Sequence, residues 1–154
     1  MHTKLYAAYG SNTNRKQMQK RCPKAKVVGK GVLNKYRLTF RGPKNGVANI
    51  EEGNGGSVPV VMWRITEACE KALDVYEGFP RLYLKKDIEV ETPEGTVSAM
   101  VYIMAGEYEK MPAKPHEYYL NIIAEGYEEH GLARDVLKKA YEECLQEINN
   151  SGIL

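Results

Sequence analysis

The chain has few cysteines: three among 154 residues, at Cys22, Cys69 and Cys144, with no C-x-x-C pair. An odd number of widely spaced cysteines does not suit a small disulfide-rich protein. The three histidines are scattered and do not combine with the cysteines at the spacing of a zinc site. We therefore expect free thiols, a reducing cytoplasmic compartment and no bound metal.

Long apolar runs are missing as well. The stretch Leu5 to Ala8 is too short for the core of a signal peptide, and no run approaches the roughly 18 apolar residues of a membrane span. With 43% apolar and 27% charged residues, the composition is that of an ordinary globular chain. We predict one domain over residues 1–154, with no membrane partner.

Acidic residues are absent from the first 50 positions, which hold 12 of the 22 Lys and Arg. A basic surface for nucleic acid is one interpretation of this asymmetry. However, the basic residues alternate with apolar, strand-like positions, and no helix-turn-helix, zinc-finger or RNP pattern accompanies them. We therefore expect the two halves to interleave in the fold, with their charges paired or solvated and no nucleic-acid partner.

The hydrophobic pattern predicts strands with helices among and after them. The predicted strands, of which the second is one long bent strand or two shorter ones, cover residues 5–9, 26–40, 47–50, 58–65, 82–92 and 96–104. A polar loop is predicted at 51–56, and a hairpin turn at 93–95. The predicted helices cover residues 14–21, 67–77, 116–130 and 132–149. This order favours an α+β fold whose sheet curls into a small mixed β-barrel with surrounding helices.

The segment Tyr9-Gly10-Ser11-Asn12 stands between a short apolar strand and a helix. Its backbone N–H groups can turn together toward an anion or a developing oxyanion, because the first donors of a helix have no acceptor within the helix. The simpler alternative is a helix cap in which Ser11 or Asn12 accepts from the first turn. Ser11 is a weak candidate for a nucleophile, since no G-x-S-x-G elbow surrounds it.

Glu77 lies on the last turn of the predicted helix 67–77, where the helix dipole disfavours a negative charge. The dipole contributes only about 0.3 to 1 kcal/mol at an exposed site. Burial beside Tyr76 or Phe79 would add to it and raise the pKa of the carboxyl toward that of a general base. A solvated glutamate at the end of a helix is the simpler alternative.

Two segments together resemble the γ-glutamylcyclotransferase family. Tyr6-Ala7-Ala8-Tyr9-Gly10-Ser11-Asn12 is similar to the Y-G-S-N signature of that family, and Leu73-Asp74-Val75-Tyr76-Glu77-Gly78 is similar to its L-D-x-x-E-G segment. The resemblance extends from about Lys4 to about Tyr141. It implies a γ-glutamylcyclotransferase-like fold, a small mixed barrel with helices around it.

The resemblance also implies a reaction. A γ-glutamyl amino acid or amide would cyclise to 5-oxoproline and release the free amine, with Glu77 as the catalytic acid/base and without a metal or an organic cofactor. Tyr83 and Tyr102 would orient Glu77 or the substrate. The substrate-binding residues that the resemblance implies are Tyr6, Ala7, Ala8, Tyr9, Gly10, Ser11 and Tyr119.

Other functions stay open on the same fold. One is a cyclotransferase for γ-glutamylamines or for a biosynthetic intermediate, because the leaving group would lie against variable loops such as Arg41 to Gly46 and Ala105 to Pro115. Another is a non-catalytic module that binds a small molecule. Apolar positions on the terminal helix, such as Leu137 and Leu145, would serve the core or the contact of a homodimer.

Overall fold

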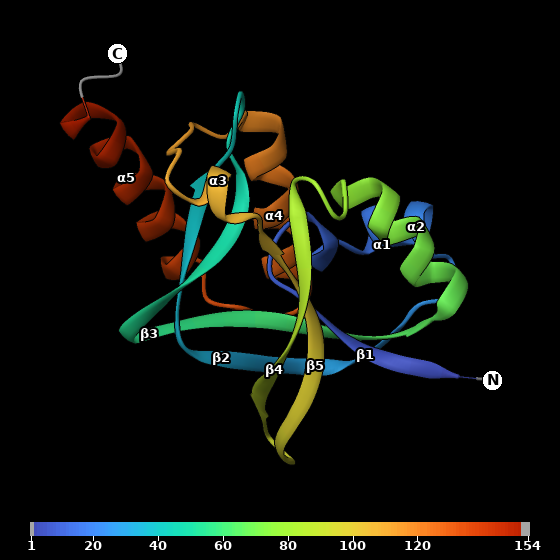
Figure 1. The fold of residues 1–154 in the computed structure, drawn as a ribbon. Helices are drawn as coiled ribbons and strands as arrows, with labels where there is room; N and C mark the ends of the chain where they lie inside the picture. Colours follow the sequence, from blue (N-terminus) through green and yellow to red (C-terminus); the bar gives the residue numbers. More distant parts are fainter. Residues whose placement is uncertain (1, 152–154) are drawn as a thin grey trace.

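The computed structural model describes residues 2–151, and within them five strands form one closed barrel in the order β1-β3-β2-β4-β5 (Figure 1). The strands are β1 (Thr3–Ala8), β2 (Lys26–Arg41), β3 (Val47–Thr66), β4 (Tyr83–Thr92) and β5 (Gly95–Met104). The helices are η1 (Ser11–Thr13), α1 (Arg15–Arg21), α2 (Glu67–Glu77), α3 (Gly106–Glu109), α4 (Glu117–Glu129) and α5 (Asp135–Asn150). The α+β class and the small mixed barrel with surrounding helices are confirmed.

The barrel closes through a short parallel contact between its first and last strands. β1 pairs with β3 along its whole length in antiparallel register, and Tyr6 of β1 stands opposite Met100 of β5 in the parallel pairing. β4 and β5 form the predicted hairpin, with Thr92 opposite Gly95. Because β1 lies between β3 and β5, the residues just after β1 are held at one end of the barrel.

Strand β3 is longer than the sequence predicted, and the prediction of a loop at 51–56 is wrong. These residues continue the strand: Glu51 and Glu52 pair with β2, residues 53–56 lie in the register shift between Asn34 and Tyr36, and pairing resumes at Ser57. Ion pairs support the pairing, because the carboxylate of Glu51 lies 2.9 Å from Nε of Arg41 and 3.4 Å from Nη2 of Arg37. The pairing and the charges of the neighbouring strand outweigh the weak strand propensity of glutamate at these two positions.

Caps fix the two helices that flank the end of the barrel. Asn14 begins α1, where its side-chain oxygen accepts from the backbone N–H groups of Lys16 and Gln17. Thr66 begins α2 and accepts from the N–H of Cys69 at 3.2 Å. Gly78 ends α2 in the left-handed conformation, with φ of 68°. The predicted boundaries of α2, and with them the place of its last turn, are therefore confirmed.

The prediction of free thiols is wrong for two of the three cysteines. Cys22, just after α1, and Cys69, in α2, form a disulfide with their Cα atoms 5.1 Å apart, whereas Cys144 is free and buried. The two partners are separated by 47 positions in the chain, and the packing of α1 against α2 brings them together. The expected reducing compartment therefore loses its support from the cysteines.

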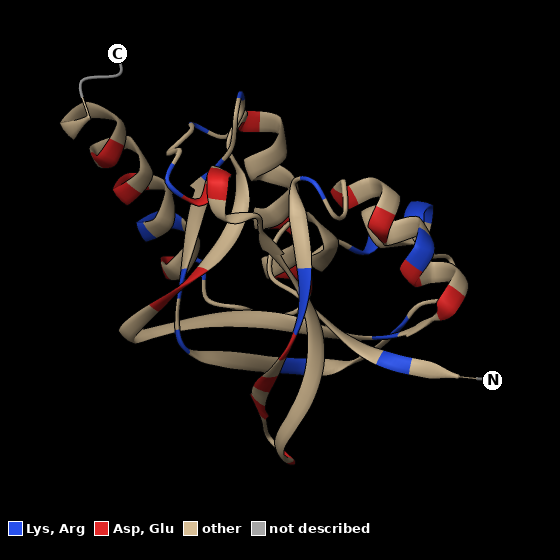
Figure 2. Cartoon of the chain, in the orientation of Figure 1, with Lys and Arg blue, Asp and Glu red and all other residues tan. Residues whose placement is uncertain are grey.

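Basic and acidic positions interleave along the helices and strands of the fold, as expected from the strand-like spacing of the basic positions (Figure 2). Lys4 of β1 pairs with Glu70 of α2 at 2.9 Å, and Lys16 of α1 lies 3.8 Å from Glu125 of α4. Each pair joins a residue from the first 50 positions to one from the remainder. No helix within residues 2–151 combines the length and the apolar character that a membrane crossing requires.

Candidate active site

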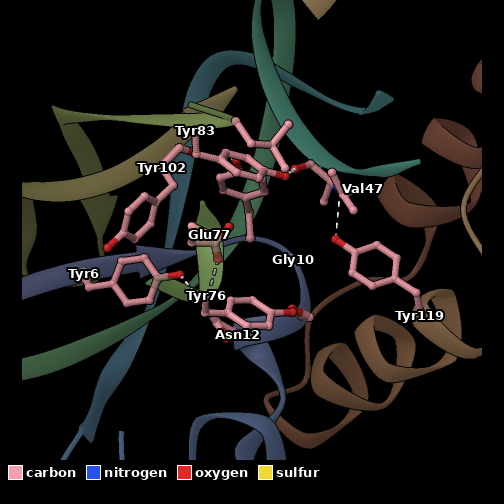
Figure 3. Close-up of a pocket in the computed structure, with 13 residues that line it drawn as sticks. Tyr6, Gly10, Asn12, Val47, Tyr76, Glu77, Tyr83, Tyr102 and Tyr119 are labelled. Carbon is pink, nitrogen blue, oxygen red and sulfur yellow. Dashed lines mark hydrogen bonds between the residues drawn. The ribbon is translucent and has the colours of Figure 1, made fainter. Parts of the chain in front are cut away.

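A cavity of about 180 Å³ opens at the end of the barrel where β1 leads into η1 (Figure 3). Residues from η1, α2 and α4 and from the ends of several strands surround it, so it depends on the whole fold. Most of its side chains are aromatic or apolar, and Glu77 is the acidic residue among them. The lining consists of Tyr6, Tyr9, Gly10, Ser11, Asn12, Val47, Ala48, Tyr76, Glu77, Leu82, Tyr83, Tyr102 and Tyr119.

Glu77 points into this cavity from the last turn of α2. Its Oε1 accepts a hydrogen bond of 3.3 Å from Nδ2 of Asn12, and no Lys, Arg or His of residues 2–151 forms an ion pair with it. Burial raises the pKa of the carboxyl to about 7, although the charge of Arg21 lowers it in part. A group with this pKa exchanges a proton readily at neutral pH.

Buried tyrosines make up most of the wall around Glu77. The hydroxyl of Tyr6 accepts from Nδ2 of Asn12 at 2.9 Å, and that of Tyr119 accepts from the backbone N–H of Ala48 at 2.9 Å. Burial raises the pKa of both tyrosines above the ordinary value, and the charge of Glu77 adds to the effect. The hydroxyls are therefore neutral and present donors and acceptors to the cavity without adding a charge.

The hydroxyls of Tyr83 and Tyr102 form hydrogen bonds with groups other than the carboxyl of Glu77. The hydroxyl of Tyr83 donates to the backbone carbonyl of Ala48, and that of Tyr102 donates to Oδ1 of Asp74 at 2.7 Å. In Figure 3 the hydroxyl of Tyr102 points away from the carboxyl of Glu77. Both rings line the cavity, while both hydroxyls brace its wall.

The loop after β1 lies close to β3 and α4 because it contains a glycine. A Cβ atom at Gly10 would lie 3.1 Å from Cβ of Ala48 and 3.6 Å from the hydroxyl oxygen of Tyr119. The indole N–H of Trp63 donates to the backbone carbonyl of Asn12 at 2.9 Å and holds the other end of the loop. The backbone at Gly10 thus approaches the cavity more closely than a larger residue would permit.

The helix-cap alternative for Ser11 and Asn12 is wrong, because Asn14 caps α1. The side chain of Asn12 turns toward Tyr6 and Glu77, and Oγ of Ser11 lies 3.1 Å from the hydroxyl of Tyr76. These two polar side chains therefore contribute to the cavity, and Asn14 caps the N-terminus of α1.

Comparison with known proteins agrees with this geometry. Residues 6–121 match the family model described as gamma-glutamyl cyclotransferase, AIG2-like. The chain belongs to this family. It is 31% identical to gamma-glutamylcyclotransferase of Bos taurus over 145 residues, which cover 88% of this chain and 76% of the relative. The protein of the same name from Homo sapiens is 30% identical, with the same coverage of both chains.

Solved structures of the family share the fold. A structure described as gamma-glutamyl cyclotransferase superimposes with a TM-score of 0.80 at 26% identity, covering 97% of this chain and 99% of the other. An AIG2-like protein from Mus musculus superimposes with a TM-score of 0.60 at 22% identity, covering 76% of this chain and 88% of the other. The predicted γ-glutamylcyclotransferase-like architecture is therefore confirmed.

The fold brings the two family segments together, although they are more than 60 residues apart in the sequence. Tyr6, Tyr9, Gly10, Ser11 and Tyr119 line one cavity with Glu77. Ala7 and Ala8 do not line it; they are buried within β1, opposite Met62 and Val61 of β3.

Sequence reasoning missed several residues of the cavity. Val47 and Ala48 gave no chemical signal, and they line the cavity because β3 begins beside the loop after β1. Tyr76 was assigned only as a neighbour that buries Glu77, and Leu82 only as the start of a strand. Asn12 was part of the recognised signature, but its bond to Glu77 depends on how α2 packs against η1.

Proposed function

We propose that this chain is a γ-glutamylcyclotransferase that converts a γ-glutamyl amino acid or amide into 5-oxoproline and a free amine, with Glu77 as general acid/base. One observation carries the proposal: a carboxyl with a pKa of about 7 lies in a cavity that the Y-G-S-N segment also lines. The names of the relatives support the same reaction.

The reaction requires proton transfers at two nitrogen atoms, because the attacking nitrogen must lose protons and the leaving nitrogen must gain one. The α-ammonium of the substrate first loses a proton to the carboxylate of Glu77, and the freed amine then attacks the γ-carbonyl carbon and forms the new C–N bond of the lactam. The resulting Glu77 carboxylic acid gives its proton to the leaving nitrogen, and its carboxylate then takes the second proton from the new ring nitrogen as the carbonyl re-forms and the old C–N bond breaks. That last proton passes to the released amine, which departs as its ammonium. A pKa near the working pH suits a group that must act as both base and acid.

The nucleophile is part of the substrate, so the protein mainly has to hold the glutamyl group in a bent, reactive conformation. The correct placement of two groups within one molecule contributes several kcal/mol on its own, on the order of 7 to 11 in favourable cases. This chemistry needs neither a metal nor an organic cofactor. Within residues 2–151, no three His, Cys, Asp and Glu side chains are grouped to hold a metal ion.

The backbone after β1 would bind the negative charges of the reaction. The N–H groups of Gly10, Ser11 and Asn12 lie where η1 begins, and the first donors of a helical turn have no acceptor within it. They would bind the α-carboxylate of the substrate or the oxyanion of the tetrahedral intermediate. Tyr6, Tyr9 and Tyr119 would enclose the glutamyl chain, while Ala7 and Ala8 would act only as the strand that supports them.

The further expectations about partners stay predictions. We propose a γ-glutamyl compound as the small-molecule partner, and the homodimer, the cytoplasmic location and the lack of a nucleic-acid partner are separate predictions. The nature of the leaving group, an amino acid or an amine, is left to the experiment below.

A substrate panel tests the proposal. The purified protein is incubated with γ-glutamyl amino acids and γ-glutamylamines, and 5-oxoproline is measured by mass spectrometry. Glu77→Gln should lower turnover by about 100-fold or more, the scale of a lost acid/base. Glu67→Gln, an exposed glutamate on the same helix, is the matched control and should keep wild-type turnover. Full activity of Glu77→Gln, or no 5-oxoproline from any compound, would contradict the proposal.

A further inference from the structure

Arg21, the last residue of α1, contacts the cavity wall from behind. Its Nη1 donates to Oδ1 of Asn12 and lies 3.4 Å from Oγ of Ser11, and its guanidinium carbon lies 3.4 Å above the centre of the Tyr76 ring. Its Nη2 donates to Gln17 at 2.8 Å, which anchors the guanidinium to its own helix. One cation that does not line the cavity thus contacts three residues that do.

The guanidinium decides which way the amide of Asn12 faces. Arginine has donors and no acceptor, so the amide oxygen must point to Arg21. The two hydrogens of the amide nitrogen then face the hydroxyl of Tyr6, at 2.9 Å, and Oε1 of Glu77, at 3.3 Å. An amide turned the other way would present its oxygen to Glu77, which suits the protonated acid and repels the carboxylate.

We propose that Arg21 is a positioning residue of this site: through Asn12 it holds Glu77 as a proton acceptor, and by stacking on Tyr76 it fixes that ring in the cavity wall. This inference rests on the proposed function for its catalytic meaning. The link between Arg21, Asn12 and the protonation of Glu77 stands on the contacts themselves and has a test of its own.

The other groups around Glu77 do not supply this effect. Asp74, one turn earlier on α2, binds Lys85 at 3.0 Å and the hydroxyl of Tyr102, so its charge is already compensated. Burial raises the pKa of Glu77, and the positive charge of Arg21 acts in the opposite direction. The other titratable side chains that line the cavity, from α2 itself and from the other elements, are hydroxyls: Tyr6, Tyr9, Tyr76, Tyr83, Tyr102 and Tyr119.

The pH dependence of kcat/KM for 5-oxoproline formation tests the role of Arg21. Arg21→Met removes the charge and every donor but keeps an unbranched side chain, so the acid limb of the profile should move up by about one pH unit. Turnover should then be about tenfold lower below the limb and should recover at higher pH. Arg21→Lys keeps a charge and a donor, so its acid limb should lie close to that of the wild type. Lys20→Gln, an exposed neighbour on α1, should leave the profile unchanged.

A direct titration separates this proposal from the proposed function. The infrared band of the Glu77 carboxyl, identified by its loss in Glu77→Gln, should persist to higher pH in Arg21→Met than in the wild type, whether or not the protein forms 5-oxoproline. If Arg21→Met does not fold, Asn12→Ala should show the same upward shift, because it breaks the same link. An unchanged titration in these variants, or a loss of turnover that is equal at every pH, would overturn the role of Arg21.

Discussion

A buried arginine and a half-buried glutamate in this protein have opposite surroundings. The side chain of Arg41 is 3% exposed, and its guanidinium donates to both carboxylate oxygens of Glu147 at 3.0 Å, to Glu51 at 2.9 Å and to the carbonyl of Glu109 at 2.8 Å. Glu77 receives one amide hydrogen bond and, within residues 2–151, has no ion-pair partner.

The difference separates a structural charge from a chemical one. Burial by itself lowers the pKa of Arg41, but its bonds to Glu147 and the charge of Glu51 outweigh this, so the pKa is raised and the charge is permanent. That charge joins β2, β3 and α5. Burial without a paired cation instead raises the pKa of Glu77 to about 7, so its proton can leave and return. Complete pairing stabilises the fold, and incomplete pairing permits proton transfer.

Removing the structural charge should have the largest effect on stability. Arg41→Met leaves Glu51 and Glu147 without their shared cation, and the loss of one partner of a buried pair costs about 3 to 5 kcal/mol. Urea unfolding would measure the loss, while turnover of the folded protein at low temperature should be retained. Adding Glu51→Gln and Glu147→Gln to the same chain should recover most of the stability. A triple variant as unstable as the single one would show that the pairing argument is wrong.

Removing the charge of Glu77 should instead raise the stability of the protein. The pKa of Glu77 is raised from 4.5 in the unfolded chain to about 7 in the fold, so ionisation of this group destabilises the protein as pH rises from 4.5 to 7. Glu77→Gln should match the wild type below pH 4.5 and become more stable by at most about 3 kcal/mol above pH 7. Thermal unfolding of both proteins across this range would measure the difference. A Glu77→Gln protein that is less stable at pH 8 would contradict the account.

An exposed ion pair should contribute least to the free energy of unfolding. Lys16 and Glu125 approach to 3.8 Å, with 80% and 47% of their side chains exposed. Lys16→Gln should change the free energy of unfolding by about 0.5 kcal/mol or less. Urea unfolding at low and high salt would check this. A loss of stability as large as that of Arg41→Met would mean that burial does not explain why Arg41 contributes more than an exposed ion pair.

Local patterns in the sequence were enough for most of the barrel and for the catalytic candidate. Thr66 and Gly78 carry the start and stop signals of α2, so Glu77 could be placed on its last turn before any contact was known. The family signature placed Tyr9 to Asn12 at the same site. The strand conformation of 51–56 was not predictable, because it depends on contacts with β2 on either side, where Glu51, Glu52 and Ser57 are paired.

Contacts between distant segments could not be read from spacing. The disulfide between Cys22 and Cys69 and the stacking of Arg21 on Tyr76 both arise where α1 packs against α2. Neither a disulfide nor the stacking of an arginine on a tyrosine requires a fixed separation of the two residues in the sequence. The exclusion of Ala7 and Ala8 from the cavity could not be predicted either, because every residue from Tyr6 to Tyr9 is buried and only the fold determines which of them face the cavity.

The most direct test of the central claim is the pH profile of kcat/KM for 5-oxoproline formation by the wild-type protein. If Glu77 must be a carboxylate to take the proton of the α-ammonium, the rate should rise with pH through an apparent pKa near 7, the value that burial gives this carboxyl. The rise should be missing from the residual rate of Glu77→Gln. An acid limb near the ordinary pKa of a solvated glutamate, or the same limb near 7 in Glu77→Gln, would contradict the assignment of Glu77 as the acid/base.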